Sequence, residues 1–182
     1  MPPEPEKRAV ILAAVWSVIA DRGIAALSFR HVAAAAGVSV GLVQHYFGSK
    51  DNLVRASAAT MIDGSALRFA EPPADPRAEL RRLIAHSVPA TPGSRRGVGV
   101  WYAYIAASVA DPELAALLRA AKRGQERSAA ELIAAAAPGI EAGSAARRLV
   151  ALADGLTARV VTGDLEPAEA VAAIDAALAD LG

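Results

Sequence analysis

The side chains best suited to specific polar contacts are concentrated in residues 28–53, SFRHVAAAAGVSVGLVQHYFGSKDNL. Arginine, glutamine, histidine and lysine in this stretch offer hydrogen-bond donors, acceptors and positive charge. Two short apolar-periodic segments are joined through Ala36-Gly37-Val38-Ser39, and a third helix start follows at Ser49-Lys50-Asp51. A helix, a tight glycine turn and a second short helix form the layout of a helix-turn-helix. The sequence therefore predicts a binding helix that the rest of the chain supports and controls.

Residues that could carry out catalysis are sparse. The sequence contains no G-x-S-x-G, P-loop or H-E-x-x-H motif, and no cysteine that could act as a thiol nucleophile. His31, His45 and His86 are too scattered along the chain for a metal-binding motif, although the sequence does not exclude that the three lie together in the folded protein. The glycine pair Gly97-Val98-Gly99 follows no predicted strand. We therefore expect a protein that is not an enzyme and has no metal or other cofactor.

The composition favours an all-α globular protein. The 182 residues are 54% hydrophobic, much of it alanine, and only 4% aromatic. Alanine is the best helix former, and β-branched runs are scarce. The absence of cysteine fits a reducing cytosol, so we expect a cytoplasmic protein. The apolar runs 9–20 and 97–110 are shorter than the ~20 residues that a membrane-spanning helix needs, and they predict buried core helices instead.

The net charge is zero, but its distribution is uneven. Residues 1–55 carry six Lys and Arg residues against four Asp and Glu residues, which leaves +2 there and −2 in the rest of the chain. This asymmetry has the right sign for contact with phosphate, but it is mild.

Start and stop signals predict about nine helices and no strand. Pro2-Pro3-Glu4-Pro5 predicts a disordered leader, and Pro72-Pro73 breaks the fourth helix. Serine or aspartate caps are expected at Ser28, Ser39, Ser49 and Asp75. The expected helices cover about residues 6–22, 28–36, 39–47, 49–70, 75–88, 101–110, 111–137, 144–163 and 167–181.

The details of the first 55 residues resemble the TetR family of one-component transcriptional regulators. The resemblance covers about residues 7–55, and beyond that it rests on helix count and layout. The matching residues are Ile11-Leu12-x-Ala14, Gly23, Ser28, Val32-Ala33, Ala36-Gly37-Val38-Ser39, Gly41, Tyr46-Phe47, Ser49-Lys50 and Leu53. The resemblance implies a DNA-binding domain at residues 6–54 and a helical domain for effector binding and dimerisation at residues 55–182.

Carried over position by position, the resemblance places residues 39–47 in the major groove of DNA. Arg30, Gln44 and His45 then read base edges, and Gly41 lets the helix approach the bases closely. The whole predicted set is Ser28, Arg30, Ser39, Val40, Gly41, Gln44, His45, Tyr46 and Lys50, of which Ser28, Ser39, Tyr46 and Lys50 fit phosphate anchoring. Leu42 and Gln44 depart from the Thr and Tyr that are usual in the family, which points to a different operator preference. His45 as an exposed residue and Tyr46 as a core ring remain alternatives.

Two apolar stripes in the last two helices fit a dimer interface. Leucine, isoleucine and valine recur at a/d-like spacing, so two copies could form a four-helix interface. The alternative is that both stripes face the core of their own protomer. The predicted interface residues are Leu149, Leu152, Leu156, Val160, Val171, Ile174 and Leu178.

A weaker signal suggests an effector pocket. Trp101, Tyr102 and Tyr104 lie in the apolar sixth helix, and His86 lies near the end of the fifth. Aromatic walls with a few polar groups are typical of small-molecule sites. The alternative that these are plain core residues is equally open.

Together these features predict a repressor that binds a palindromic operator as a homodimer and is released by a small-molecule effector. Helix 49–70 is expected to be the only covalent bridge that links the operator and effector affinities. The rival interpretation is a helical protein-interaction module with a relict helix-turn-helix, which would not bind specific DNA.

Overall fold

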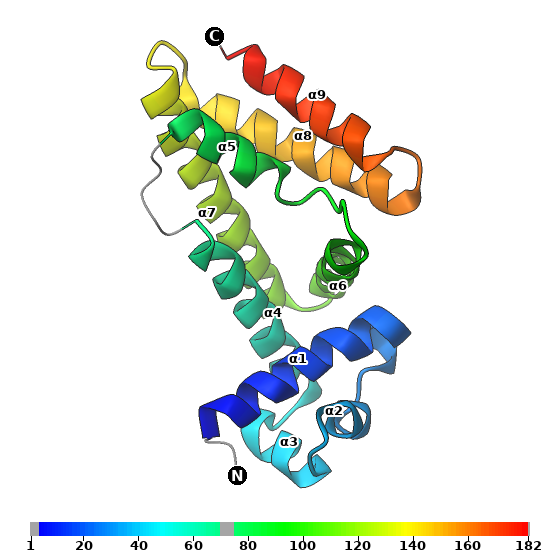
Figure 1. The fold of residues 1–182 in the computed structure, drawn as a ribbon. Coiled ribbons are helices and arrows are strands. Elements are labelled where there is room, and N and C mark those ends of the chain that lie inside the picture. Colours follow the sequence, from blue (N-terminus) through cyan, green and yellow to red (C-terminus); the bar gives the residue numbers. More distant parts are fainter. Residues whose placement is uncertain (1–3, 70–74, 182) are drawn as a thin grey trace. The chain divides into compact units, whose positions relative to one another are not determined.

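The computed structural model describes residues 4–69 and 75–181. The described ranges contain helices and no strand, so the predicted all-α fold is confirmed. Figure 1 shows the elements, which are α1 (Glu4–Arg22), a 3-10 turn (Ile24–Ala26), α2 (Phe29–Ala36), α3 (Val40–Phe47), α4 (Lys50–Leu67), α5 (Pro76–Ala85), α6 (Pro92–Ser108), α7 (Pro112–Ala136), α8 (Ala142–Thr162) and α9 (Pro167–Ala179).

Most helix ends agree with the predicted ones to within a few residues, and the start of α6 is the largest departure. The helix begins at Pro92, well before the expected Trp101. The reason is a reciprocal cap: the Thr91 amide donates to Ser94 Oγ at 2.9 Å, and the Ser94 amide donates to Thr91 Oγ1 at 3.1 Å. Proline suits the first helical position because its missing N–H would have no partner there.

The proline-rich leader was predicted too long. Glu4 and Pro5 belong to α1, whose first turn tolerates proline. Pro2 and Pro3, and the predicted helix break at Pro72-Pro73, lie outside the described residues.

The predicted caps are confirmed at the four expected starts. Ser28, Ser39 and Ser49 each accept the backbone N–H three residues ahead through the side-chain oxygen, at 3.1 to 3.2 Å. Asp75 Oδ1 accepts the Arg77 amide at 2.9 Å. These bonds satisfy amides that a helix cannot pair internally.

The described chain forms two compact units. The first comprises residues 4–68 and 99–118, and the second comprises residues 69, 75–98 and 119–181. Consequently α6 and α7 each contribute to both units, and the chain passes between the units three times. The expectation of one covalent bridge through helix 49–70 is therefore wrong for these units. The boundaries 6–54 and 55–182 concern functional domains and stay a prediction.

The core of the first unit is built around α1, which packs against α2 and α4. One face of α1 is buried, with Ile11 and Val15 both 0% exposed. Val32 of α2, Val43 of α3 and Leu53 of α4 belong to the same buried cluster. The short helices are thus held by shared burial of apolar side chains.

A buried polar chain crosses this core from α1 through α4 to α6. Trp16 Nε1 donates to the Ser57 carbonyl at 3.2 Å, and Ser57 Oγ donates to the Val54 carbonyl at 2.8 Å. Because the Ser57 proton is used in that bond, Tyr104 must donate its hydroxyl to Ser57 Oγ, 2.7 Å away. Burial raises the pKa of Tyr104 to about 12, so the phenol remains a donor at neutral pH.

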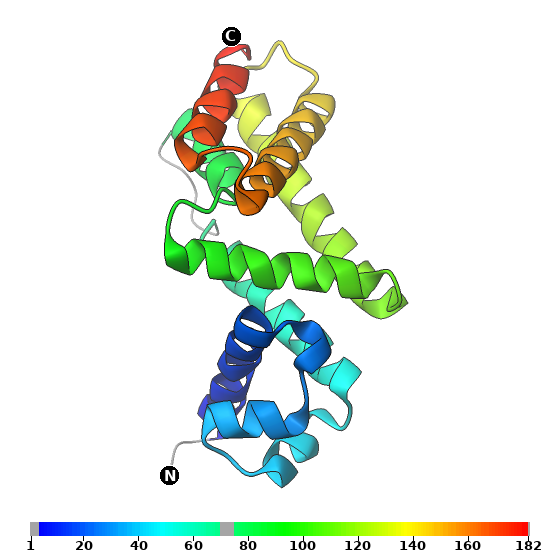
Figure 2. The ribbon, with the colours of Figure 1, turned by 90° about the vertical axis from the view of Figure 1, so that its right-hand side faces the viewer.

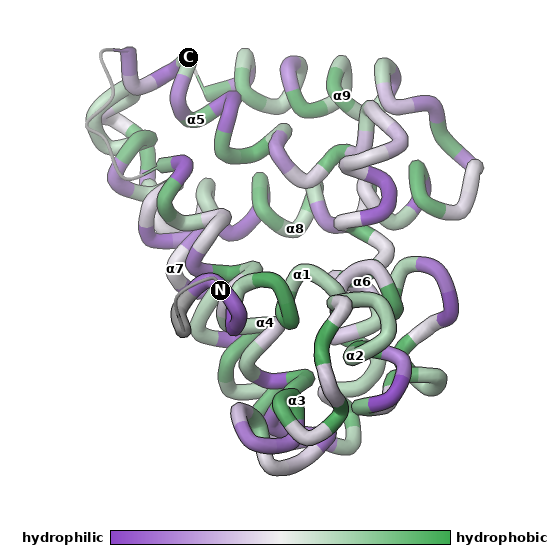
Figure 3. The backbone as a smooth tube through the Cα atoms, turned by 60° about the horizontal axis from the view of Figure 1, so that its bottom comes forward, coloured by the Kyte–Doolittle hydropathy of each residue, from purple (hydrophilic) through white to green (hydrophobic). Residues whose placement is uncertain are grey.

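The second unit is centred on α8, which packs against α5 and α9. Figure 2 shows α8 and α9, in orange and red, lying side by side, and Figure 3 shows hydrophobic and hydrophilic positions alternating along both helices. Ile84, Ile133 and Ile174 are each 0% exposed in this second cluster. On the surface, Arg81 pairs with Asp175 through two hydrogen bonds of 2.6 and 2.9 Å.

The buried polar chain predicts unequal costs for two small truncations. Ser57→Ala leaves the Tyr104 hydroxyl without its acceptor and should lower the free energy of unfolding by about 1–3 kcal/mol. Tyr104→Phe leaves Ser57 bonded to Val54 and should cost only ~1 kcal/mol. Urea unfolding followed by circular dichroism measures both, with the more exposed Ser108→Ala as a control expected within ~0.5 kcal/mol of the unsubstituted protein. A larger cost for Tyr104→Phe than for Ser57→Ala would contradict this assignment of the donor.

Candidate nucleic-acid interface

The turn between α2 and α3 is closed by backbone geometry that the sequence specifies. Gly37 ends α2 in the left-handed region at φ 67°, where a side chain would be strained. The Val38 amide then donates back to the Ala33 carbonyl at 3.0 Å, and Ser39 starts α3 with its side-chain cap. Both short helices therefore have fixed ends, and the predicted helix-turn-helix layout is present.

Helix α3 has one buried face and one exposed face. Val43 is 0% exposed and Phe47 is 6% exposed, which anchors the helix in the core of the first unit. The Arg8 guanidinium lies over the Phe47 ring at 5.7 Å, a cation–π contact from α1. Four of the predicted DNA contacts, Val40, Gly41, Gln44 and His45, are exposed on this helix.

Gly41 lies on that exposed face with no packing reason to be glycine. A Cβ atom added there would meet nothing within 4 Å, and the residue does not have a positive φ. The fold would therefore accept alanine at this position. A smooth helix surface is what a close partner outside the protein would need.

The side chains predicted to contact phosphate differ in how exposed they are and in whether they bond within the protein. Ser39 and Lys50 are exposed, and Ser28 is half-buried. Lys50 Nζ donates to the Ala25 carbonyl at 3.4 Å, which draws its ammonium toward the 3-10 turn. Arg30 is exposed on the first turn of α2, and among the described residues it has no hydrogen-bond or ion-pair partner.

Tyr46 is partly the core ring that the sequence left as an alternative, and its contact with phosphate stays a prediction. It is half-buried and packs against the first core cluster, with its ring 6.1 Å from that of Phe47. The His45 ring also meets the Tyr46 ring edge-on, with the centroids 5.8 Å apart. Tyr46 is therefore partly a core ring, and His45 is an exposed side chain with one ring neighbour.

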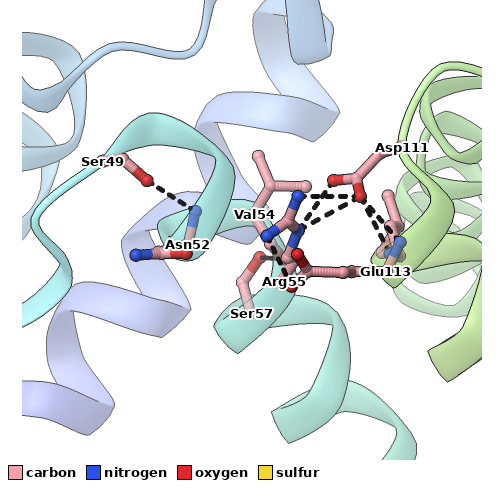
Figure 4. A network of polar contacts seen from close by, with 8 residues as sticks. Ser49, Asn52, Val54, Arg55, Ser57, Asp111 and Glu113 are labelled. Atoms are coloured by element: carbon pink, nitrogen blue, oxygen red, sulfur yellow. Dashed lines mark hydrogen bonds and ion pairs between the residues drawn. The ribbon is translucent and has the colours of Figure 1, made fainter.

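A charged cluster near this interface was missed by the sequence analysis, which counted Arg55 only toward the net charge. Arg55 of α4 donates three hydrogen bonds to the two carboxylate oxygens of Asp111, at 2.9 to 3.2 Å, and one to Glu113 at 2.7 Å (Figure 4). The bond from Arg55 lowers the pKa of the Asp111 carboxyl, which therefore stays ionised at neutral pH. A start signal at Asp111-Pro112-Glu113 was visible in the sequence, but nothing local identifies its partner 56 residues away.

The four predicted pocket residues do not all belong to one unit. Trp101, Tyr102 and Tyr104 lie in the first unit, whereas His86 lies in the second. Tyr104 is 0% exposed and part of the core, and Trp101 and Tyr102 are half-buried. His86 is exposed and meets the Phe69 ring edge-on at 5.5 Å. The effector pocket stays a prediction.

The predicted dimer residues divide between the protomer's own core and its surface. Leu149, Leu156, Val160 and Ile174 are at most 8% exposed inside the second unit, whereas Leu152, Val171 and Leu178 are half-buried. A shallow groove runs between α8 and α9. Its lining residues are Ala145, Arg148, Leu149, Leu152, Ala177, Asp180 and Leu181. The dimer interface stays a prediction.

The part of the chain that the structure describes contains no cluster of three or more histidine or acidic side chains arranged to hold a metal ion. None of its helices is both long and apolar enough to cross a membrane.

Comparison with protein families gives two adjacent matches. Residues 11–57 match the family described as "Bacterial regulatory proteins, tetR family". Residues 76–182 match the family described as "BetI-type transcriptional repressor, C-terminal". The first match covers α2, α3 and the turn between them, and the second covers α5 to α9.

Individual relatives agree with both matches. The chain is 32% identical to the HTH-type transcriptional regulator BetI of Stenotrophomonas maltophilia over 160 residues, covering 86% of this chain and 82% of the relative. A transcriptional regulator from Saccharomonospora viridis, solved in complex with choline, is 26% identical with a TM-score of 0.86 over 94% of this chain and 95% of that one. A regulator from Rhodococcus sp. Rha1 is 27% identical with a TM-score of 0.85, covering 98% and 96%. The chain therefore belongs to the tetR family and is a BetI-type transcriptional regulator.

Proposed function

We propose that the protein is a repressor that binds a palindromic operator as a homodimer and leaves it when a small-molecule effector binds. The observation that carries the proposal is the exposed face of α3. Its side chains contribute little to the fold, while Val43 and Phe47 on the opposite face hold the helix rigidly. An exposed, anchored helix after a tight turn fits the recognition helix that lies in the major groove.

Within this proposal, reading and positioning are separate tasks. Gln44 can hydrogen-bond adenine at N6 and N7, and Arg30 can bond guanine at O6 and N7, each through two bonds. His45 offers one further donor or acceptor. Ser28, Ser39, Tyr46 and Lys50 contact phosphates, since hydroxyl and ammonium donors fix the register without reading sequence. Ser39 can do so while capping α3, because its oxygen accepts the Leu42 amide and its proton is free to be donated.

Dimerisation is supported by the groove between α8 and α9. Leu152 and Leu181 leave part of their apolar surface uncovered there, and the small, half-buried side chain of Ala177 permits close approach. A two-fold dimer would present two copies of α3 to two half-sites, separated by ~34–36 Å or a multiple of it.

For the effector, we propose a quaternary ammonium compound of the choline class. The support comes from the choline bound to the Saccharomonospora viridis regulator and from the half-buried aromatic rings of Trp101 and Tyr102 in this chain. Aromatic faces attract such cations, whose charge cannot be neutralised by proton loss. Because linkage is reciprocal, an effector that weakens operator binding must itself bind less tightly to the operator-bound protein.

Substitutions at Gln44 and Lys50 should separate the recognition of bases from the contacts with phosphates. In gel shifts with the region next to the protein's own gene, Gln44→Ala should weaken specific binding by about 2–6 kcal/mol, roughly 1–3 for each protomer of the dimer, and leave binding to unrelated duplexes unchanged. Lys50→Ala should weaken both kinds of binding and reduce the slope of log affinity against log salt by about 2, roughly 1 for each protomer of the dimer.

The matched control is Arg123→Ala, which removes an exposed cation from α7. It should bind the duplex as the unsubstituted protein does. If the unsubstituted protein shows no specific shift at moderate salt, the operator proposal is wrong.

Choline should stabilise the protein against heat. At a concentration ~100 times the dissociation constant, a ligand that binds only the folded state adds about 2.7 kcal/mol of stability, which a thermal-shift assay detects. Trp101→Ala should reduce this shift, because it removes one aromatic face. Equal shifts with choline chloride and sodium chloride would exclude choline itself, and no shift with any quaternary ammonium compound would exclude the class.

A further inference from the structure

The first residue of α3, Val40, is an apolar side chain that the fold leaves exposed to water. It is 44% exposed, whereas Val43 on the next turn is 0% exposed. Among the described residues, Val40 belongs neither to the buried cluster of the first unit nor to the apolar side chains packed against it. Single exposed valines are common on protein surfaces and need no explanation by themselves. The significance of Val40 therefore depends on what surrounds it.

The neighbours of Val40 hold its backbone in place and leave its side chain accessible. Ser39 Oγ accepts the Leu42 amide at 3.2 Å, so the start of α3 is fixed. Gly41 has no side chain, and the space that its Cβ atom would enter is open. Gln44 is exposed and lies four residues further along, on the same side of the helix. The exposed face of α3 therefore begins with an apolar side chain and continues with polar groups one turn later.

The methyl groups of Val40 are also restricted in orientation. A β-branched side chain in a helix strongly prefers one χ1 rotamer. The helix itself is anchored by Val43 and Phe47, which are 0% and 6% exposed. Val40 would therefore lose little conformational freedom on contact with a partner, and such preorganisation favours binding.

The major groove of DNA offers one apolar group that such a side chain can contact. The edges of the base pairs carry hydrogen-bond donors and acceptors there, together with the 5-methyl group of thymine. A valine placed against a donor or acceptor would leave that polar group without a bond, which is unfavourable. A valine placed against the thymine methyl removes apolar surface of both partners from water. The N-terminal residues of a recognition helix contact base edges, and Val40 occupies the first position of α3.

We propose that Val40 is a specificity-determining residue that recognises a thymine of the operator through its 5-methyl group. The inference rests on the proposed operator binding and names one of the bases that are read. Val40 and Gln44 are four residues apart, which corresponds to ~6 Å along a helix. Neighbouring base pairs are ~3.4 Å apart, so the thymine should lie within about two base pairs of the adenine that Gln44 contacts.

The proposal is tested by replacing thymine with uracil, which lacks only the 5-methyl group. Gel shifts compare the affinity of the protein for two forms of a duplex from the region next to its own gene, one with thymine and one with uracil. The unsubstituted protein should bind the uracil form more weakly, by about fourfold for each methyl group that it buries and about 15-fold when both half-sites of a dimer are changed.

Val40→Ala should remove this difference, so that the two duplexes are bound equally to within about twofold, the usual error of additivity. A substitution that only disturbed α3 would weaken binding to both duplexes by the same factor. The ratio of the two affinities therefore separates contact with the methyl group from a structural role of Val40. The matched control is Val10→Ala, which truncates a valine of α1 that is 48% exposed and should keep the ratio of the unsubstituted protein.

Single replacements then locate the base. Uracil is placed at one thymine at a time, and 7-deazaadenine, which lacks the N7 acceptor, is placed at one adenine at a time. The thymine whose effect disappears in Val40→Ala should lie within about two base pairs of the adenine whose effect disappears in Gln44→Ala. A greater separation would contradict the assignment of this thymine to Val40.

The two proposals fail in different ways. If the unsubstituted protein gives a specific shift but binds the thymine and uracil duplexes equally, the role of Val40 is wrong and operator binding stands. The role of Val40 is also wrong if Val40→Ala keeps the full preference for thymine, because another side chain then contacts the methyl group. If the unsubstituted protein gives no specific shift with the thymine duplex, operator binding is wrong and the role of Val40 is lost with it.

Discussion

The structure depends on burying one side of α3. An eight-residue helix is far below the length that is stable alone in water, so α3 exists because Val43 and Phe47 enter the core of the first unit. The end caps at Ser39 and Gly48 add the hydrogen bonds that so short a helix lacks. This constraint explains the roles of the neighbouring helices: α2 and α4 form the walls against which α3 packs, and α1 supports both.

Because one face of α3 is fully committed to the core, its other face is free for a partner. Val40, Gly41, Gln44 and His45 can vary without loss of the fold, which suits a surface that must match one DNA sequence. The same core extends to α6 and α7 through Val100, Tyr104 and Leu114, and Arg55 of α4 bonds to Asp111 at the start of α7. The position of the exposed face of α3 thus depends on contacts with helices beyond the helix-turn-helix.

The local features of the fold were predictable and the long-range ones were not. A serine that caps the start of a helix, a glycine at a tight turn and an Asp-Pro pair at a helix start can each be recognised from a few neighbouring residues. The partners of Arg55 and Tyr104 lie 56 and 47 residues away and have no local signature. The stripes of α8 and α9 show the remaining ambiguity: Val160 and Ile174 repeat at dimer-like spacing, yet both are 0% exposed within one protomer. Heptad spacing identifies an apolar face and does not say which neighbour covers it.

The central claim is that the protein binds a palindromic DNA sequence as a dimer. Selection of bound duplexes from a randomised pool tests this claim most directly. The account predicts enrichment of one inverted repeat whose half-sites are centred about 10 base pairs, or a multiple of that, apart. It also predicts that Leu152→Glu, which places a charge in the groove between α8 and α9, abolishes selection for the second half-site. Enrichment of a single unrepeated site by the unsubstituted protein, or no enrichment at moderate salt, would contradict the account.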